Sequence, residues 1–315
     1  MNPIHVINVS GGKDSTALLI HAVHNCGFDV VPVFADTGNE HHFTLEYLDY
    51  LETFFGPIRR IKADLSASFS HVRRALVLGK WLGEGIGDDR IESALCALHP
   101  TGIPFLDLCL MKGRFPSANA RFCSGALKTT PIRQQIIDPL LCAGHFVVSW
   151  HGVRAGESAA RAKLPPLEFP DPAEDFAIYR PLLPWSDADV FALHERHGIQ
   201  PNPLYRCGMK RVGCMPCIFA GKMELRRIGM RFPDEIDRIA SWEKHVSRAS
   251  KRGCAAFFHS SKTPGPHQRD HSLPMPDIHA VIEWSKTSYG GIKPASCSDE
   301  SFSISGCTSV YGLCE

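Results

Sequence analysis

Apolar segments of two kinds alternate along the first 64 residues of the chain. Short apolar runs at 5–9, 30–35 and 58–62 have the length of buried strands, whereas the longer runs at 16–25 and 43–55 have the length and spacing of helices. Strands and helices that alternate in this order are typical of a parallel, doubly wound sheet. The pattern therefore predicts an α/β fold for this part of the chain.

The regular alternation stops after the third predicted strand, and strand character returns later. Residues 66–116 show helical pieces broken by glycine and proline, so we expect a helical insertion with a loop at 83–87. A further apolar strand is predicted at 146–150. Ser186 and Asp189 have the spacing of a capping box and predict the start of another helix.

Composition limits the classes of protein to which the chain can belong. Its 315 residues, of which 44% are hydrophobic, suffice for a buried core in one large domain or two small ones. A net charge of +1 excludes a globally basic surface, so any contact with nucleic acid requires a local patch. No apolar run of about 18 residues and no signal segment is present, so we expect a soluble cytoplasmic protein without a membrane partner. Twelve cysteines then favour metal binding or thiol chemistry over disulfides.

The segment Ser10-Gly11-Gly12-Lys13-Asp14-Ser15 lies where the first predicted strand gives way to the first predicted helix. Its small residues let the backbone turn tightly, so that N–H groups and the helix N-terminus converge on an anion such as phosphate. The spacing differs from the G-x-x-x-x-G-K-[ST] loop of nucleoside triphosphatases. An ordinary tight turn is the alternative. Asp36-Thr37-Gly38 closes the second strand at the carboxyl edge, where such sheets bind ligands.

A second group of charged residues follows the strand at 146–150. His151-Gly152-Val153-Arg154 is followed by Glu157 and Arg161. A guanidinium at the carboxyl end of a strand can hold phosphate or sulfate through two hydrogen bonds, which favours Arg154 as an anion ligand. Glu157 and Arg161 also have the i,i+4 spacing of a helical ion pair, and that alternative stays open.

Cysteines and basic residues concentrate in the second half of the chain. Cys214 and Cys217 have a spacing that lets both thiolates reach one metal ion or cluster, although a redox dithiol has the same spacing. Between 206 and 252 the chain carries 12 Lys or Arg against 5 Asp or Glu. Predicted helices at 223–232 and 236–252 could line a channel for a polyanion or form a solvated basic face.

Together these motifs resemble the phosphoadenylyl-sulfate (PAPS) reductase family of the PP-loop adenine-nucleotide alpha-hydrolase superfamily. The loop at 10–15 matches the pattern S-G-G-x-D-S, and residues 152–161 match G-[IV]-R-x-x-E-S-x-x-R. Trp185 begins a segment similar to the family's W-x-x-x-D-V-[WF] helix. The resemblance implies a Rossmann-like parallel sheet with an adenine nucleotide at its carboxyl edge.

The resemblance also implies roles for particular residues. The loop would bind the phosphates, the end of the second strand would lie near the adenine, and Lys13 and Arg154 would act in catalysis. The implied nucleotide-binding residues are Ser10, Gly11, Gly12, Lys13, Asp14, Ser15, Ala35, Asp36, Thr37, Gly152, Arg154, Glu157 and Arg161.

The cysteine elements depart from one branch of the family and resemble another. Assimilatory adenylyl-sulfate reductases have two adjacent cysteines in the upstream element, whereas here Ser124 follows Cys123 and Cys207 supplies the missing thiolate. This departure resembles the iron–sulfur DNA phosphorothioation sulfurtransferases and the phage proteins grouped with them. The implied ligands of a [4Fe–4S] cluster are Cys123, Cys207, Cys214 and Cys217. A zinc ion would use the same ligands, and four unrelated buried thiols are a further alternative.

Two chemistries share this scaffold. PP-loop ATP pyrophosphatases use ATP with Mg²⁺ to adenylate an oxygen of the acceptor, and a sulfur nucleophile then displaces the adenylated oxygen. Sulfonucleotide reductases instead attack the sulfur of PAPS or APS with a cysteine of a Glu-Cys-Gly-Leu-His tail. This chain ends Tyr311-Gly312-Leu313-Cys314-Glu315 instead, so Cys314, with Cys297 and Cys307, is a candidate nucleophile. We favour ATP-dependent sulfur transfer, with a donor such as a cysteine desulfurase and nucleic acid as acceptor. The alternatives are a reductase served by thioredoxin and a nucleotide-binding regulator without turnover.

The expected organisation follows from these assignments. We expect a PP-loop nucleotide-binding domain over 1–200 with its helical insertion at 66–116, an iron–sulfur and basic helical region over 201–262, and a loosely packed tail with cysteines over 263–315.

Overall fold

The computed structural model describes residues 2–258 and 275–288, which divide into two compact units. The described part of the first unit comprises residues 2–63 and 124–215, and that of the second comprises 64–123, 216–258 and 275–288. Each unit therefore combines stretches that are separate in the sequence, whereas the division expected at 200 and 262 follows chain order.

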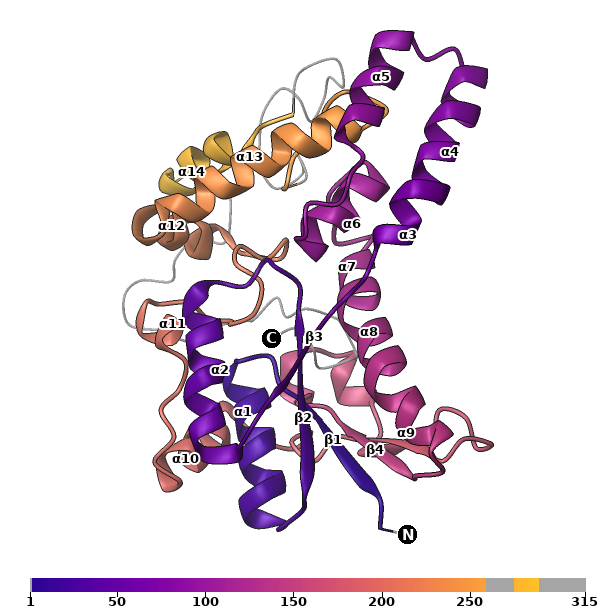
Figure 1. The fold of residues 1–315 in the computed structure, drawn as a ribbon. Helices are drawn as coiled ribbons and strands as arrows, with labels where there is room; N and C mark the ends of the chain where they lie inside the picture. Colours follow the sequence, from indigo (N-terminus) through magenta and orange to yellow (C-terminus); the bar gives the residue numbers. More distant parts are fainter. Residues whose placement is uncertain (1, 259–274, 289–315) are drawn as a thin grey trace. The chain divides into compact units, whose positions relative to one another are not determined.

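The first unit is built on a six-stranded sheet with the strand order β3-β2-β1-β4-β6-β5, of which Figure 1 labels β1 to β4. Neighbouring strands are parallel except for the edge pair β5 and β6, which is antiparallel. The parallel part confirms the predicted doubly wound α/β fold, whereas the antiparallel edge was not predicted. The strands are β1 (Ile4–Asn8), β2 (Val30–Asp36), β3 (Arg59–Lys62), β4 (Val147–Trp150), β5 (Leu167–Glu168) and β6 (Phe176–Tyr179).

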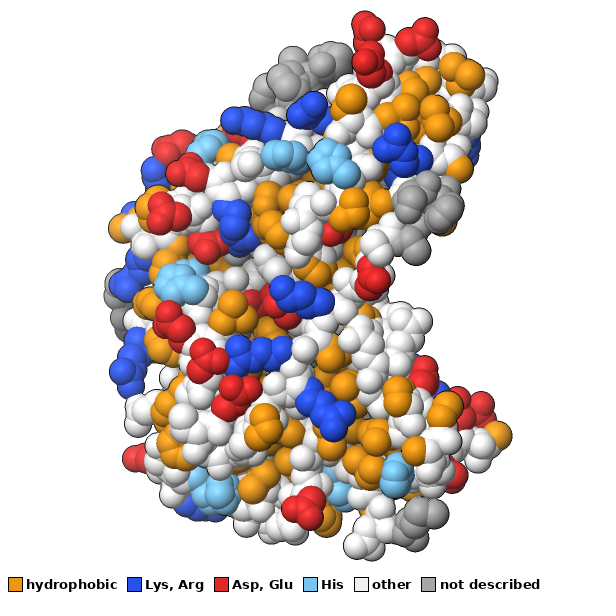
Figure 2. All heavy atoms as spheres, viewed as in Figure 1, with side chains coloured by type: hydrophobic (Ala, Val, Ile, Leu, Met, Phe, Trp, Pro, Cys, Tyr) orange, Lys and Arg blue, Asp and Glu red, His pale blue; other side chains and the backbone are white. Residues whose placement is uncertain are grey.

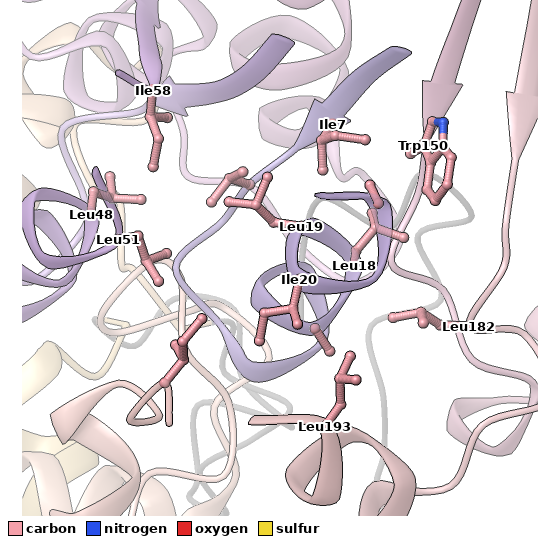
Figure 3. Close-up of a cluster of buried hydrophobic side chains, with 14 of the residues drawn as sticks. Ile7, Leu18, Leu19, Ile20, Leu48, Leu51, Ile58, Trp150, Leu182 and Leu193 are labelled. Atoms are coloured by element: carbon pink, nitrogen blue, oxygen red, sulfur yellow. The ribbon is translucent and has the colours of Figure 1, made fainter. Parts of the chain in front are cut away.

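Successive residues of β1 reach the cores on opposite faces of the sheet. Ile7 packs with Leu18 and Trp150 in one cluster, which Figure 3 shows together with side chains of the neighbouring helices. Val6 packs with Ile136 in the other cluster. Because both faces are covered, apolar residues of this central strand point to both sides, as is typical of a parallel sheet. The two polar residues of the strand, His5 and Asn8, form hydrogen bonds with Trp150.

Helices cover the two faces of this sheet, and those predicted before residue 64 and at Ser186 are confirmed. Ser186 Oγ accepts from Asp189 N (3.2 Å) and the Asp189 carboxylate accepts from Ser186 N (2.8 Å), so the capping box is confirmed too. The helical segments of the first unit are α1 (Lys13–Ile20) with a π-helical continuation (His21–Asn25), α2 (His42–Phe55), α8 (Thr130–Ile132) between π-helical segments (Gly125–Thr129 and Arg133–Ile137), α9 (Asp138–Cys142), α10 (Asp187–Arg196) and α11 (Pro203–Arg206). The short helix α7 (Phe122–Ser124) lies where the chain passes between units.

The second unit is helical in its described residues. It contains helices between 66 and 112 and two basic helices after 222, so the helical character predicted for both stretches is confirmed, whereas the predicted domain boundaries stay a prediction. Its helices are α3 (Ser66–Ser68), α4 (Arg74–Leu76) with adjoining π-helical segments (Phe69–Arg73 and Val77–Trp81), α5 (Asp88–Ala97), α6 (Pro104–Lys112), α12 (Lys222–Arg231), α13 (Pro233–Ala249) and α14 (Ile278–Lys286).

Helix α14 lies inside the region that we expected to be loosely packed, and there the expectation is wrong. Ile278, Val281 and Ile282 are buried. A Cβ atom added to Gly229 of α12 would lie 2.5 Å from Ile282 Cγ2, so these two helices pack closely. The candidate nucleophiles Cys297, Cys307 and Cys314 lie outside the described residues. None of the helices described is both long and apolar enough to cross a membrane.

Candidate functional site

The loop at 10–15 is a closed turn between β1 and α1. Ser15 Oγ accepts from Ser10 N (3.1 Å) and donates to Gly12 O (3.1 Å). Gly11 has φ +80°, and a Cβ atom there would lie 2.7 Å from Thr44 Cγ2, so only glycine fits. Helix α1 has Gly12 at its N-cap with no side-chain hydrogen bond. The loop therefore leads its backbone directly into a helix N-terminus, which favours a bound anion.

Four charged side chains form a chain of ion pairs at this helix N-terminus. The fully buried Asp14 carboxylate lies 2.9 Å from Lys13 Nζ through Oδ2 and 2.7 Å from Arg154 Nε through Oδ1. Asp187 Oδ1 accepts from Arg154 Nη2 (2.9 Å) and lies 3.5 Å from Lys13 Nζ. The Asp187 side chain is 53% exposed, unlike the other three. The two buried cations, Lys13 and Arg154, thus both contact the exposed Asp187 carboxylate.

The segment after β4 holds Arg154 against the loop. A Cβ atom on Gly152 would lie 3.3 Å from the Asp14 carbonyl group, so the two backbones are in close contact. Burial disfavours the Arg154 charge, but Asp14, Asp187 and Glu157 together raise the pKa of Arg154. Glu157 accepts from Arg154 N (2.9 Å) and forms an ion pair with the buried Arg161. The ion-pair alternative for Arg161 is therefore confirmed, and its part in nucleotide binding stays a prediction.

Three further residues, which were not predicted to contact the loop, form hydrogen bonds with its backbone. Asn202 Nδ2 donates to Gly11 O (3.1 Å), and Tyr205 Oη accepts from Lys13 N (2.9 Å). His194 Nε2 lies 2.9 Å from Lys13 O, and burial lowers the pKa of His194. Nothing in the local sequence relates Asn202 and Tyr205 to their partners in the loop, which lie 191 and 192 positions earlier.

The end of β2 lies at the same carboxyl edge of the sheet, because β2 is parallel to β1. Ala35 and Thr37 are buried, and Asp36 forms an ion pair with Lys62 at 3.1 Å. Beyond the strand, Glu40 Oε2 accepts from Thr37 N (3.1 Å) and Glu40 Oε1 accepts from Thr37 Oγ1 (2.8 Å). Burial raises the pKa of Glu40, although the positive charge of Lys128 opposes this.

The four cysteines predicted as cluster ligands are divided between the two units. Cys207 and Cys214 belong to the first unit, and Cys123 and Cys217 belong to the second. Four thiolates are a donor set typical of iron–sulfur or zinc sites, but each unit by itself supplies only two of them. Within the ranges 2–258 and 275–288, no three His, Cys, Asp or Glu side chains form a group that could hold a metal ion. The cluster therefore stays a prediction.

The basic stretch between 206 and 252 is partly engaged in local contacts. Lys222 Nζ lies 4.7 Å from the centre of the Trp284 ring, and the Arg238 guanidinium lies 4.3 Å from that of Trp242. Arg226 and Arg231 of α12 are exposed. On the face drawn in Figure 2, basic and acidic side chains are interspersed. These contacts fit a solvated basic face better than a channel, and a channel for a polyanion stays a prediction.

Residues 112–220 match the phosphoadenosine phosphosulfate reductase domain. An uncharacterized 37.8 kDa protein of Escherichia phage 186 is 46% identical over 331 residues, covering 99% of this chain and 97% of that protein. An adenosine 5′-phosphosulfate reductase of Allochromatium vinosum is 32% identical over 124 residues, which cover 38% of this chain and 45% of the reductase.

Two further similarities are more limited in extent or identity. An adenosine 5′-phosphosulfate reductase of Neisseria meningitidis is 34% identical over 111 residues, covering 34% of this chain and 42% of the reductase. The match thus spans less than half of the length of either reductase. A phosphoadenylyl-sulfate reductase from Candida auris, solved as a phosphate complex, has a TM-score of 0.40 and 17% identity, covering 68% of this chain and 82% of that one.

Proposed function

Because the chain belongs to the phosphoadenosine phosphosulfate reductase family of PP-loop proteins, we propose that it is a nucleotide-binding enzyme that uses ATP to transfer sulfur. The observation that carries this proposal is the pair of buried cations, Lys13 and Arg154, at the N-terminus of α1. A glycine-containing loop, a helix N-terminus and two fixed cations in one place make a site suited to a polyphosphate.

The proposed nucleotide lies along the carboxyl edge of the sheet. Its phosphates contact residues 10–15 and Arg154, and its adenine lies near Ala35, Asp36 and Thr37. The backbone contact between Gly152 and Asp14 supports this arrangement, because it brings the arginine segment onto the loop. In this arrangement the exposed Asp187 carboxylate gives way to the phosphates, which then take over its contacts with Lys13 and Arg154.

The proposed reaction adenylates an oxygen of the acceptor. The acceptor oxygen attacks the α-phosphorus of Mg²⁺-bound ATP, the bond to the bridging oxygen breaks, and pyrophosphate leaves. Lys13 and Arg154 offset the negative charge that develops on the leaving group, and this effect is available only because both cations are held in advance. A sulfide-level nucleophile, supplied by a desulfurase with a thiol reductant, then displaces AMP from the acceptor.

Cys123, Cys207, Cys214 and Cys217 are the proposed ligands of a [4Fe–4S] cluster, with zinc as the alternative. Nucleic acid is the proposed acceptor, and the exposed arginines of α12 support it only as a local basic surface. Measuring the iron and zinc content of the protein isolated without oxygen tests the proposed cluster directly.

Reduction of a sulfonucleotide is the second candidate, favoured by the relatives that are named adenosine 5′-phosphosulfate reductases. In that reaction a cysteine thiolate attacks the sulfur of the substrate, the bond between sulfur and the phosphate oxygen breaks, and AMP leaves. A thioredoxin-type dithiol then reduces the thiosulfonate and releases sulfite. Cys314 is the candidate nucleophile, so Cys314→Ser would abolish sulfite release while leaving metal content unchanged.

Parallel assays of the anaerobically isolated protein separate the candidates. Pyrophosphate release from ATP that depends on added nucleic acid supports sulfur transfer, and sulfite release from adenosine 5′-phosphosulfate with thioredoxin supports the reductase. Nucleotide binding without either activity points to a regulator. Lys13→Met should abolish the activity that is found, whereas the exposed Lys163→Ala serves as the matched control. Absence of nucleotide binding by calorimetry would overturn all three candidates.

A further inference from the structure

The segment at Cys214 and Met215 contacts the residues that follow β2 through both backbone and side-chain atoms. Cys214 forms an isolated antiparallel bridge with Glu40, and Met215 N donates to Asn39 O at 2.7 Å. The Cys214 sulfur lies 3.8 Å from Glu40 Oε1 and 3.6 Å from Thr37 Oγ1. All of these residues belong to the first unit, so the contacts are internal to one compact body.

Glu40 takes part in two of these contacts, the backbone bridge and the contact of its carboxylate with the Cys214 sulfur. Its Oε2 accepts from the backbone N–H of Thr37, and its Oε1 accepts both from the Thr37 hydroxyl and from the Cys214 thiol. Thr37 is buried at the edge of the sheet where the adenine is proposed to lie. A movement of the Thr37 backbone or hydroxyl therefore reaches Cys214 through the Glu40 carboxyl group and through the direct contact between Thr37 Oγ1 and Cys214 Sγ.

We propose that Glu40 is a positioning residue that couples occupancy of the β2 edge to the order of the segment at Cys214 and Met215. A nucleotide that packs against Thr37 fixes the Thr37 hydroxyl and N–H, which fixes Glu40 and in turn its bridge partner. Coupling between two sites is reciprocal, so anything that orders the Cys214 segment strengthens nucleotide binding by the same factor. This inference rests on the proposed nucleotide binding and requires no particular metal at the cysteines.

Amide hydrogen exchange tests the coupling, because the Met215 N–H lies in the hydrogen bond that would be ordered. The full-length protein is compared with and without saturating ATP or adenosine 5′-phosphosulfate. We expect exchange of the Met215 amide to slow about tenfold on nucleotide binding in the unsubstituted protein and less than about twofold in Glu40→Ala. The matched control Glu46→Ala, on the exposed face of α2, should keep the full effect.

Conservative variants distinguish coupling from a merely structural role. Glu40→Gln keeps one oxygen acceptor and should retain an intermediate effect of about threefold. If Glu40→Ala does not fold, Thr37→Val decides, because it removes the hydroxyl that contacts both Glu40 and Cys214. Thr37→Val should reduce the effect below about threefold, and an unchanged tenfold effect in either variant would overturn the inference.

Failure of this inference differs from failure of the proposed function. If calorimetry shows that both nucleotides bind the unsubstituted protein and the Met215 amide exchanges at an unchanged rate, the coupling is refuted and nucleotide binding stands. If neither nucleotide binds, the proposed function fails, and the coupling fails with it.

Discussion

Arg154 and Asp14 form a buried ion pair, with Arg154 Nε 2.7 Å from Asp14 Oδ1. Asp14 belongs to the first turn of α1, and Arg154 follows β4, so the pair joins the helix that carries the loop to the neighbouring strand. Asp14 is fully buried and also contacts Lys13. The carboxylate therefore holds both cations in place, and removing it should affect stability as well as anion binding.

Asp14→Asn should destabilise the protein strongly. It removes the buried carboxylate that contacts Lys13 and Arg154 and leaves them the partly exposed Asp187 carboxylate. Breaking a buried pair by removing one partner costs about 3–5 kcal/mol. Urea unfolding monitored by circular dichroism measures the change. The control is Asp29→Asn, because Asp29 is exposed. A loss of less than about 1 kcal/mol for Asp14→Asn, as expected for an exposed ion pair, would contradict the structural role given to this residue.

Asp187→Asn should strengthen anion binding. The exposed Asp187 carboxylate lies within 3.5 Å of both Lys13 and Arg154 and competes with an incoming anion. Removing a partly exposed charge pair of about 1 kcal/mol should raise the affinity for pyrophosphate about fivefold. Calorimetric titration measures this, with Glu195→Gln on the same helix as the control. Unchanged or weaker binding would mean that the anion does not take the place of Asp187.

Gly11→Ala should both destabilise the protein and weaken nucleotide binding. The positive φ of Gly11 and the approach to Thr44 make a Cβ atom unfavourable by roughly 1–3 kcal/mol. Gly156→Ala is the matched control, because a Cβ atom there has no neighbour within 4 Å. Thermal unfolding and nucleotide titration measure the two effects. If the two variants had the same melting temperature and the same affinity for nucleotide, the close approach of Gly11 to Thr44 would be refuted.

Stability should fall as pH rises because of Glu243 in the second unit. Glu243 accepts from Phe257 N (2.7 Å) and Ile278 N (2.9 Å), and burial raises the pKa of Glu243 to about 7 from its usual 4.5. Between pH 4.5 and 7 the folded protein therefore binds more protons than the unfolded chain. The free energy of unfolding should decrease across this window by up to about 3 kcal/mol.

The Glu243 prediction is checked by urea unfolding at several pH values. Glu243→Gln should remove this contribution to the pH dependence, because the amide does not titrate. Glu92→Gln, at an exposed position of α5, should leave the pH dependence as it is. A Glu243→Gln protein with the same pH dependence as the unsubstituted protein would show that another group is responsible.

Local features of the sequence were sufficient for much of the fold. The strand at β1, the turn at 10–15 and the capping box of Ser186 and Asp189 each depend on residues a few positions apart, and spacing alone identifies them. The antiparallel pair β5 and β6 was missed, because two residues of β5 give no recognisable alternation. Helix α14 was missed because the many Pro, Gly and Ser residues of the surrounding tail suggested loose packing, whereas its apolar face is buried.

The sequence by itself determined the alternation of strands and helices before residue 64, the loop between β1 and α1 and the identity of the two cations. Only the tertiary structure decided that Asp187 contacts both cations, that Tyr205 and His194 hold the Lys13 backbone, and that Glu40 joins Thr37 to Cys214. The reason is physical: periodicity and capping are set by neighbours within one turn or one strand. Contacts between residues more than 170 positions apart exist only once the sheet has brought its carboxyl edge together.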